Sequence, residues 1–146
     1  MDIRVMTIQD YDAVYALWMR SKNMGFNNLD DSREGIARYL ARNPGTCFVA
    51  EADGRVVGAI LAGHDGRRGH LCHAAVANDC RRQGIGTALV KAAVQALEAR
   101  GIHKVNLVVF ERNEAGNAFW DRLGFGRRED LVYRDRALAD LRRIDT

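Results

Sequence analysis

The chain of 146 residues contains no long apolar run. No stretch approaches the roughly 18 consecutive apolar residues from which a membrane-spanning helix is made, so no membrane partner is expected. The first residues, Met1-Asp2-Ile3-Arg4-Val5, also lack the charged and then apolar layout of a secretory signal peptide. These two absences lead us to expect a cytoplasmic protein.

Cysteine is scarce, and the chain is not strongly charged. The cysteines Cys47, Cys72 and Cys80 form an odd set without an export signal, which argues against a disulfide framework and fits a reducing compartment. The net charge is only +3, and the basic pairs are dispersed among acids. Without a contiguous basic face carrying aromatic side chains, we expect no nucleic-acid partner.

Repeats, low-complexity stretches and interdomain linkers are absent as well. A chain of this length can bury roughly two thirds of its unfolded surface in one core. Its 47% hydrophobic and 28% charged residues are ordinary for a globular protein. We therefore expect residues 1–146 to form a single domain that carries the whole function.

Apolar periodicity predicts the elements of the first half. Alternating residues indicate a strand over 3–8, and apolar residues recur at helical spacing from about residue 10 to residue 21. Residues 25–31 are polar and rich in turn formers. Asp31 and Glu34 then resemble a capping box at the start of a short helix.

A β-hairpin is expected in the middle of the chain. Residues 46–52 and 55–62 are β-prone, and Asp53-Gly54 joins them. This dipeptide suits the two-residue type I′ turn, in which both central positions need a positive φ.

Apolar stripes and glycines set the boundaries in the second half. The expected elements are a strand over 70–77, a helix over about 84–100, a strand over 103–110, a helix from Asn113 or Glu114 to about 123, and a strand pair within 126–134. Residues 137–144 carry a weak apolar stripe and are expected to be a short helix or frayed. The resulting order, β-α-α-β-β-β-α-β-α-β, indicates a mixed α/β domain with helices packed on a sheet.

The stretch Arg81-Arg82-Gln83-Gly84-Ile85-Gly86-Thr87-Ala88 has the composition of an anion-binding loop. It follows an apolar strand and opens into a helix, whose first turn offers unpaired N–H groups and the positive end of the peptide dipole. Glycines let that backbone approach an anion closely, and the arginines add charge. An ordinary glycine loop before a surface helix is the alternative.

Two known phosphate motifs do not match this loop. A dinucleotide fingerprint needs a third glycine where Leu89 stands, and an acidic residue where Asn106 stands. The Gly-Lys-Ser/Thr string of a nucleoside triphosphate P-loop does not occur. Nicotinamide binding and nucleotide hydrolysis are therefore not expected.

Residues 71–125 closely resemble the acyl-CoA-binding core of the GNAT superfamily of N-acetyltransferases. The motifs that carry the resemblance are Arg81-x-x-Gly84-x-Gly86, the Ala75-Val76 pair before it, and Asn113, Ala118, Trp120 and Leu123-Gly124-Phe125 after it. Upstream, residues 48–58 look like the central hairpin of the family. Residues 65–69 look like those of a bacterial branch of small acetyltransferases.

The resemblance implies a mixed, mostly antiparallel sheet flanked by helices, with a parallel strand pair that splays apart around acetyl-CoA. The pyrophosphate would be bound by the loop residues Arg81, Arg82, Gln83, Gly84, Ile85, Gly86 and Thr87. The N–H of Val76, beside Ala75, would donate to the thioester carbonyl, where donors stabilise an oxyanion. Asn113 and Asn117 would contact the pantetheine arm, and Trp120 would form a wall beside it.

The resemblance also implies that a substrate amine attacks the thioester directly in a ternary complex. An alkylamine with a pKa near about 10.4 needs roughly 4–5 kcal/mol to become neutral at pH 7, so a base is useful. The family often has a glutamate on one of two strands, where this chain has His70 and Val108. His70, whose residue type titrates near neutrality, is one candidate base. Glu51 on the hairpin is another, and both also fit a solvent-facing structural role.

One position departs from the family pattern. Trp120 stands where many members have a tyrosine that protonates the leaving thiolate, and an indole N–H has no useful acidity. Either solvent or Tyr133, from the C-terminal region, would supply that proton.

A metal site is not expected. In a regular strand His70 and Cys72 point one way and His73 the other, so these side chains would not converge on one ion. Trp18, Phe26, Asp30 and Asp31 correspond to the acceptor-lining helices of the family. Acids there suit a cationic amine, and a solvated loop explains them equally.

Two functions remain after these arguments. The first is an acetyl-CoA-dependent N-acetyltransferase acting on a primary amine of a small molecule or protein. The second is a catalytically weak CoA-binding regulatory or scaffold domain, which Trp120 and the missing glutamates favour. The sequence leaves the acceptor and a homodimer open.

Overall fold

The computed structural model describes all residues from Met1 to Thr146. A five-stranded sheet in the order β1-β3-β4-β5-β6 forms its centre, and β2 and β7 form a separate two-stranded sheet. The strands are β1 (Asp2–Val5), β2 (Gly25–Asn27), β3 (Phe48–Ala52), β4 (Arg55–His64), β5 (Gly69–Val76), β6 (Val105–Asn106) and β7 (Arg143–Asp145). The main helices are α1 (Tyr11–Arg20), α2 (Arg33–Arg42), α3 (Ile85–Glu98) and α4 (Glu114–Arg122).

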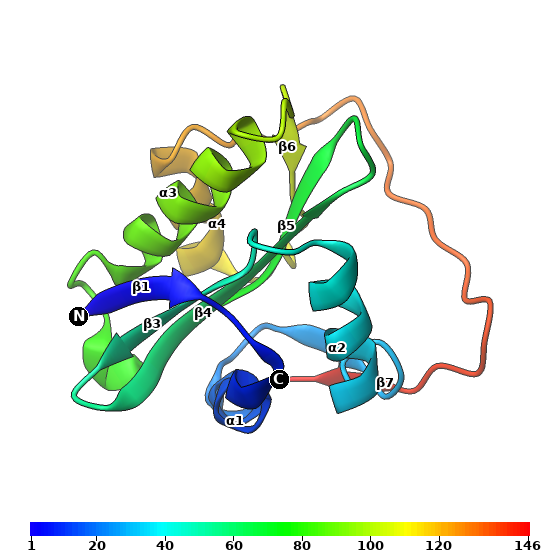
Figure 1. Cartoon of the computed structure of the whole chain (residues 1–146). Helices are drawn as coiled ribbons and strands as arrows, with labels where there is room; N and C mark the ends of the chain where they lie inside the picture. Colours follow the sequence, from blue (N-terminus) through cyan, green and yellow to red (C-terminus); the bar gives the residue numbers. More distant parts are fainter.

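All neighbours in the main sheet are antiparallel except β5 and β6, which are parallel. Helices α1 and α2 cover one side of this sheet, and α3 and α4 cover the other (Figure 1). The predicted mixed α/β architecture, with its parallel pair, is confirmed.

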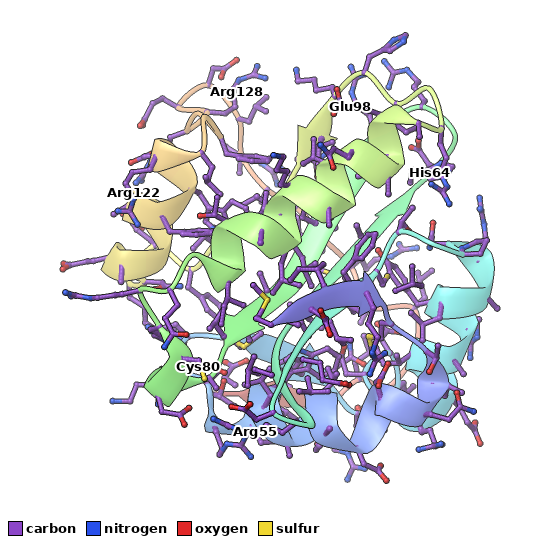
Figure 2. All side chains as sticks on the ribbon, turned by 60° about the vertical axis from the view of Figure 1, so that its left-hand side comes forward. Arg55, His64, Cys80, Glu98, Arg122 and Arg128 are labelled. Carbon is purple, nitrogen blue, oxygen red and sulfur yellow. The ribbon has the colours of Figure 1, made fainter.

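The core lies between the sheet and the apolar stripes of α1 and α3. Val14, Leu17 and Trp18 are the buried residues at the centre of α1, and Leu89, Ala93 and Leu97 form the stripe of α3. The opposite side of α3 carries polar groups such as Glu98, which points to solvent (Figure 2). Amphipathic spacing thus decides which side of each helix meets the sheet.

The predicted hairpin is confirmed. Asp53 and Gly54 join β3 to β4 with φ angles of 52° and 76°, as a type I′ turn requires. The short helix α2 also occurs where expected. The predicted N-cap residue, Asp31, is wrong. Ser32, rather than Asp31, accepts a hydrogen bond from the Gly35 N–H.

The predicted strand pair within 126–134 is wrong, because this segment contains no strand. All residues from 126 to 134 are exposed, including the apolar run of Leu131, Val132 and Tyr133. Charged side chains of the segment pair locally, as Arg128 does with Asp130 at 2.9 Å. Without alternation of apolar residues the segment has no face to bury, and it runs as an extended loop around the molecule (Figure 1).

Three other segments differ from the prediction in their length or in their secondary structure. The strand expected over 103–110 is reduced to β6, Val105–Asn106. The turn-rich segment 25–31 contains β2, and the tail is neither a helix nor frayed, because β7 pairs with β2. Phe26, which is buried, lies opposite Ile144 in this pair. An apolar residue on each short strand therefore fixes the end of the chain against the body.

Candidate functional site

A cleft opens where β5 and β6 separate. The two strands are paired only at Gly69 with Val105 and at His70 with Asn106. Beyond this point residues 107–110 leave β5, and both segments line a wider cleft of about 2240 Å³ that also extends to α2 and to the C-terminal segment. The edge of β5 that faces the cleft is therefore not covered by a neighbouring strand.

Most residues predicted to bind acetyl-CoA line this cleft. They are Ala75, Val76, Arg81, Arg82, Gly84, Ile85, Gly86, Thr87, Asn113 and Trp120. Gln83 and Asn117 lie outside the lining. The end of β5, the glycine loop, the start of α3 and the helix α4 thus meet around one opening.

The start of α3 presents free backbone donors to the cleft. Gly84 is the N-cap with a φ of 79°, and no side chain caps the helix. The first helical hydrogen bond runs from the Ala88 N–H to the Gly84 carbonyl at 3.0 Å. The preceding N–H groups, up to Thr87, have no acceptor within the helix, so they and the helix dipole favour an anion.

The peptide groups at the end of β5 alternate in direction: those on one edge hydrogen-bond to β4, and those on the other edge face the cleft. The Ala77 N–H, directly after the strand, donates to the Val57 carbonyl of β4 at 2.8 Å. Successive N–H groups of an extended chain point to opposite edges. The Val76 N–H is therefore directed away from β4, toward the edge that β6 has left.

The two asparagines of α4 have different surroundings. The Asn113 side-chain oxygen accepts from the Gly116 N–H at 3.0 Å, and its amide nitrogen has no partner in the protein. The Asn117 amide nitrogen donates to the carbonyls of Phe110 and Asn113. Asn113 thus has a donor available to the cleft, whereas Asn117 holds the backbone before α4.

The aromatic candidates differ in their exposure. Trp120 is half-buried, and its ring lies edge-on to Phe119 and Phe125, with centroids 5.0 and 5.2 Å apart. Tyr133 also lines the cleft, but it belongs to the extended loop and is 71% exposed. Trp120 is a fixed wall of the cleft, and Tyr133 is a polar group at its solvent side.

The two predicted base candidates lie in different places. His70 lines the cleft, and its Nδ1 lies 2.6 Å from Asn106 Oδ1. Glu51 is outside the cleft lining, on the β1 side of the sheet. Its carboxylate accepts from Arg4 at 2.8 Å, and Arg4 also contacts Asp10. Glu51 is thus part of an ion-pair network that joins β1, β3 and the start of α1.

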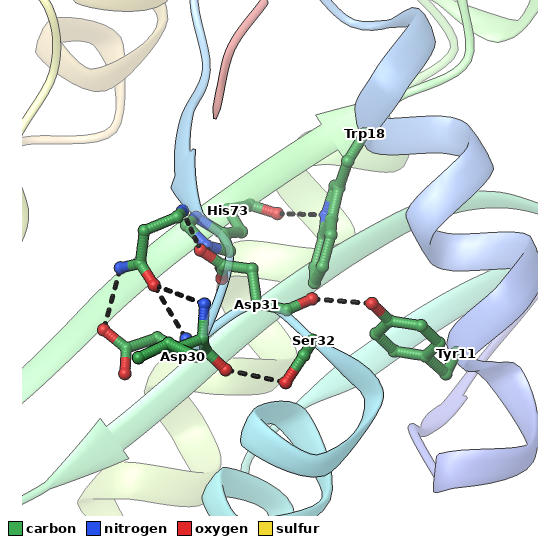
Figure 3. A network of polar contacts seen from close by, with 8 residues as sticks. Tyr11, Trp18, Asp30, Asp31, Ser32 and His73 are labelled. Atoms are coloured by element: carbon green, nitrogen blue, oxygen red, sulfur yellow. Dashed lines mark hydrogen bonds and ion pairs between the residues drawn. The ribbon is translucent and has the colours of Figure 1, made fainter. Parts of the chain in front are cut away.

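A histidine and an aspartate that the sequence analysis did not connect form a pair in the cleft. His73 Nε2 lies 2.6 Å from Asp31 Oδ1 (Figure 3). Asp31 is only 6% exposed, and its other oxygen accepts from the Asn27 N–H at 2.8 Å. The Tyr11 hydroxyl donates to the Asp31 carbonyl at 2.6 Å. Asp31 is therefore a buried, fixed carboxylate and does not belong to a solvated loop.

A β-bulge directs His73 toward Asp31. Ala59 pairs with Ala75 and Leu61 with Cys72, so three steps along β5 match two along β4. His73 has a φ of 54°, a left-handed conformation that costs a non-glycine residue roughly 1–2 kcal/mol. Its carbonyl accepts from Trp18 Nε1 at 3.2 Å. The expectation of a regular strand, with alternating directions at 70, 72 and 73, is corrected by this bulge.

Two cysteines line the cleft as well. Burial raises the pKa of the Cys72 thiol to about 12, so this group stays protonated at neutral pH. The Cys80 sulfur lies 3.5 Å from Arg55 Nη2, at the end of the molecule where both are labelled in Figure 2. A protonated Cys72 is a poor nucleophile.

No group of three or more His, Cys, Asp or Glu side chains is arranged so that it could share a metal ion. None of the helices combines the length and apolar character needed to cross a bilayer.

Known proteins share this sequence pattern and fold. The acetyltransferase (GNAT) family matches over residues 11–125. A protein named acetyltransferase from the bacterium Pectobacterium atrosepticum is 32% identical over 140 residues, which cover 96% of this chain and 98% of that protein.

Solved structures share the fold at lower sequence identity. Ard1 from Thermoplasma volcanium superposes with a TM-score of 0.75 at 23% identity, over 84% of this chain and 80% of that one. The PaiA N-acetyltransferase from Thermoplasma acidophilum, in complex with coenzyme A, gives a TM-score of 0.73 at 17% identity, over 86% and 89%. With the family match over most of its length, the chain belongs to the acetyltransferase (GNAT) family and is an N-acetyltransferase.

Proposed function

We propose that this protein transfers the acetyl group of acetyl-CoA to a primary amine of a small molecule or protein, by direct attack in a ternary complex. One observation carries the proposal. The uncapped start of α3 and the free edge of β5 open into the same cleft. A donor with a phosphate at one end and a thioester at the other can therefore contact both.

The phosphate end has the chemistry that a pyrophosphate requires. The N–H groups of Ile85, Gly86 and Thr87 supply fixed donors, and Arg81 and Arg82 supply positive charge beside them. No side chain at Gly84 stands between the loop and an incoming anion. These features support acetyl-CoA as the co-substrate, with no metal needed to bind its phosphates.

The thioester end depends on the backbone of β5. The Val76 N–H, directed to the open edge, would donate to the thioester carbonyl and stabilise the negative charge that develops on its oxygen. The free amide nitrogen of Asn113 would hydrogen-bond the pantetheine arm. Trp120 would form the apolar wall along that arm.

Direct transfer is supported by the state of Cys72, one of the two thiols that line the cleft. A covalent acetyl-cysteine route would need a thiolate, and the raised pKa of Cys72 keeps that group protonated. After transfer the CoA thiolate takes a proton from Tyr133 or from water, since Trp120 cannot release one. The Tyr133→Phe variant distinguishes these two donors.

A second candidate is a CoA-binding domain with little turnover, and Trp120 in place of an acidic phenol favours it. The test is a panel of aliphatic diamines, amino-acid amides and short peptides with free amino termini, followed by release of the CoA thiol. Acetyl-CoA binding is measured separately by calorimetry. Thiol release with at least one amine supports the transferase, and binding without release from any amine supports the second candidate. Absence of acetyl-CoA binding contradicts both.

A further inference from the structure

We propose that His73 is the base that accepts the proton of the attacking amine, and that Asp31 is the positioning residue that makes it one. The inference deepens the proposed function and rests on it. It concerns a pair of side chains, brought together by a bulge on β5 and by the segment before α2, that lies in the same cleft as the Val76 N–H.

The contact with Asp31 fixes which nitrogen of His73 is basic. A carboxylate has only acceptor oxygens, so His73 Nε2 carries the hydrogen and donates it to Asp31 Oδ1 across 2.6 Å. The Nδ1 atom then holds the lone pair. It makes no hydrogen bond within the protein, and no side-chain nitrogen of the chain is both fully buried and unpartnered. His73 Nδ1 is therefore accessible from the cleft.

The ring is held in this orientation from several sides. Trp18 and Phe26 pack edge-on against it, with centroids at 5.0 and 4.6 Å. Asp31 itself is fixed by the Asn27 N–H and, through its carbonyl, by Tyr11 (Figure 3). A base whose rotamer and tautomer are both set can receive a proton in one defined direction.

The position along β5 favours His73 over His70. Three residues of a strand span about 10 Å and six span about 20 Å. His73 is three residues before Val76, and His70 is six residues before it. An amine that attacks a carbonyl held at the Val76 N–H is thus closer to His73, which lines the same cleft. The strained φ of His73 is the backbone distortion that gives its ring this direction.

The proton and electron balance of the step is simple. An ammonium group donates one proton to His73 Nδ1, and the resulting amine uses its lone pair to form the C–N bond with the acetyl carbon. The C–S bond breaks, and its electron pair goes to the CoA sulfur. The nitrogen releases a second proton, and the sulfur gains one from Tyr133 or water, which the released proton replaces. His73 returns its proton to solvent, while Asp31 stabilises the imidazolium in between.

The test compares two nucleophiles that differ in their need for a base. The probes are the best aliphatic amine of the panel, which is protonated at neutral pH, and hydroxylamine, which is largely neutral there. His73→Gln keeps a donor toward Asp31 and removes the basic nitrogen. We expect it to lower kcat/KM for the aliphatic amine about 100-fold or more, to lower it less than about tenfold for hydroxylamine, and to leave the Kd of acetyl-CoA within about threefold. Asp31→Asn should give the same selective loss at a smaller magnitude.

The controls separate a chemical role from a structural one. His103→Gln is the matched substitution at an exposed histidine outside the cleft, and it should change neither rate. His73→Asn is the second variant, because asparagine tolerates a left-handed φ and keeps the bulge if glutamine disturbs it. Thermal unfolding of each variant checks the fold.

Three results overturn the proposal. Equal loss with both nucleophiles in the folded variants assigns His73 a structural role. No loss with the aliphatic amine shows that no base acts at His73. An amine-selective loss in His70→Gln that is absent in His73→Gln assigns the base to His70. If the wild-type protein releases no thiol with any amine, the proposed function itself fails, and this outcome is distinct from the other three.

Discussion

Gly86 lies directly against the ring of Phe119, so that a Cβ at position 86 would stand 3.2 Å from two of its ring carbons. The start of α3 and the helix α4 therefore lie so close together that only glycine, which has no side chain, fits at position 86 without displacing Phe119. Gly84 differs, because a Cβ there meets nothing within 4 Å while its φ is 79°. The two glycines of the loop are required for different physical reasons, one for space and one for backbone conformation.

Gly86→Val should therefore lower both stability and acetyl-CoA affinity. The added methyl groups must displace Phe119, and overpacking of this kind costs about 1–3 kcal/mol. The crowding against Phe119 also shifts the backbone of the loop, and with it the Gly86 N–H that would bind the phosphate. We therefore expect the Kd of acetyl-CoA to rise about tenfold or more. Calorimetric titration and urea unfolding measure the two effects.

Gly84→Ala is the matched control for that variant. Its cost comes from the left-handed φ alone, roughly 1–2 kcal/mol of stability, without a steric conflict. Affinity should fall less than in Gly86→Val. If Gly86→Val binds acetyl-CoA as tightly as the wild type does, the loop is not the phosphate site.

Binding of acetyl-CoA should change the fluorescence of Trp120. This indole lines the cleft, whereas Trp18, the only other tryptophan, is fully buried against Phe26 and His73. We expect a titration with acetyl-CoA to alter the emission of the wild type and of Trp18→Phe. Trp120→Phe should lose most of the change, with binding followed independently by calorimetry. A full change in Trp120→Phe would place the bound molecule away from this wall.

Arg4 should stabilise the fold in a pH-dependent way. Its guanidinium, which hydrogen-bonds Asp10, lowers the pKa of that carboxyl from the usual 3.8. The folded protein then binds fewer protons at Asp10 than the unfolded chain does, so the stabilisation is present above pH 3.8 and is lost as the pH falls below it.

Arg4→Met should accordingly lower the free energy of unfolding by about 1 kcal/mol at neutral pH, a modest value because Arg4 is partly exposed. The difference between variant and wild type should shrink as the pH is lowered, which urea unfolding at a series of pH values measures. Arg143→Met is a control, since it removes an exposed pair with Asp145 at the chain end. A difference that stays constant at low pH would contradict the assignment to Asp10.

The three cysteines should react at very different rates. Cys47 is 1% exposed and its pKa is raised to about 11 by burial, so it has neither access nor thiolate. Cys72 is protonated for the same reason. We expect a thiol reagent at near-neutral pH to label Cys80 first in the folded protein. Labelling of Cys47 and Cys72 should require unfolding.

Mass spectrometry of the labelled protein measures the order of reaction. In Cys80→Ser, rapid labelling should disappear, while urea should still expose two reactive thiols. Fast modification of Cys72 in the folded variant would show that the cleft thiol is available, and would reopen the acetyl-cysteine route that its protonation disfavours.

The sequence was most informative where a structure is determined by neighbouring residues. The Asp53-Gly54 turn requires two positive φ angles, and both are present because the local chemistry alone demands them. The start of α3 at Gly84 was also located correctly, since the glycines before it and the apolar stripe of the helix are local signals. These features needed no knowledge of the rest of the fold.

The sequence was least informative where distant segments meet. Nothing within β5 marks His73 as the bulged residue, and its contact with Asp31 joins positions 42 apart in the chain. A histidine two residues before the Ala75-Val76 pair, together with an acidic residue before α2, was the available signal. Glu51 was a candidate base because of its residue type, and only its contact with Arg4 placed it in another part of the molecule. The length of β6 likewise depends on tertiary packing.

The pairing of β2 with β7 has a consequence for how the domain folds and opens. The neighbouring strands β3, β4 and β5 are joined by short turns, whereas the bond from the Thr146 hydroxyl to Met24 spans 122 positions. Long loops close at an entropic cost that short ones avoid, so this pair should form late. Detachment of β7 would uncover Phe26 and release one side of the His73 ring while leaving α3 and its loop intact. We therefore expect amide hydrogens of the two halves of the cleft to exchange by separate opening events, with the His73 half protected less than the half around Gly84.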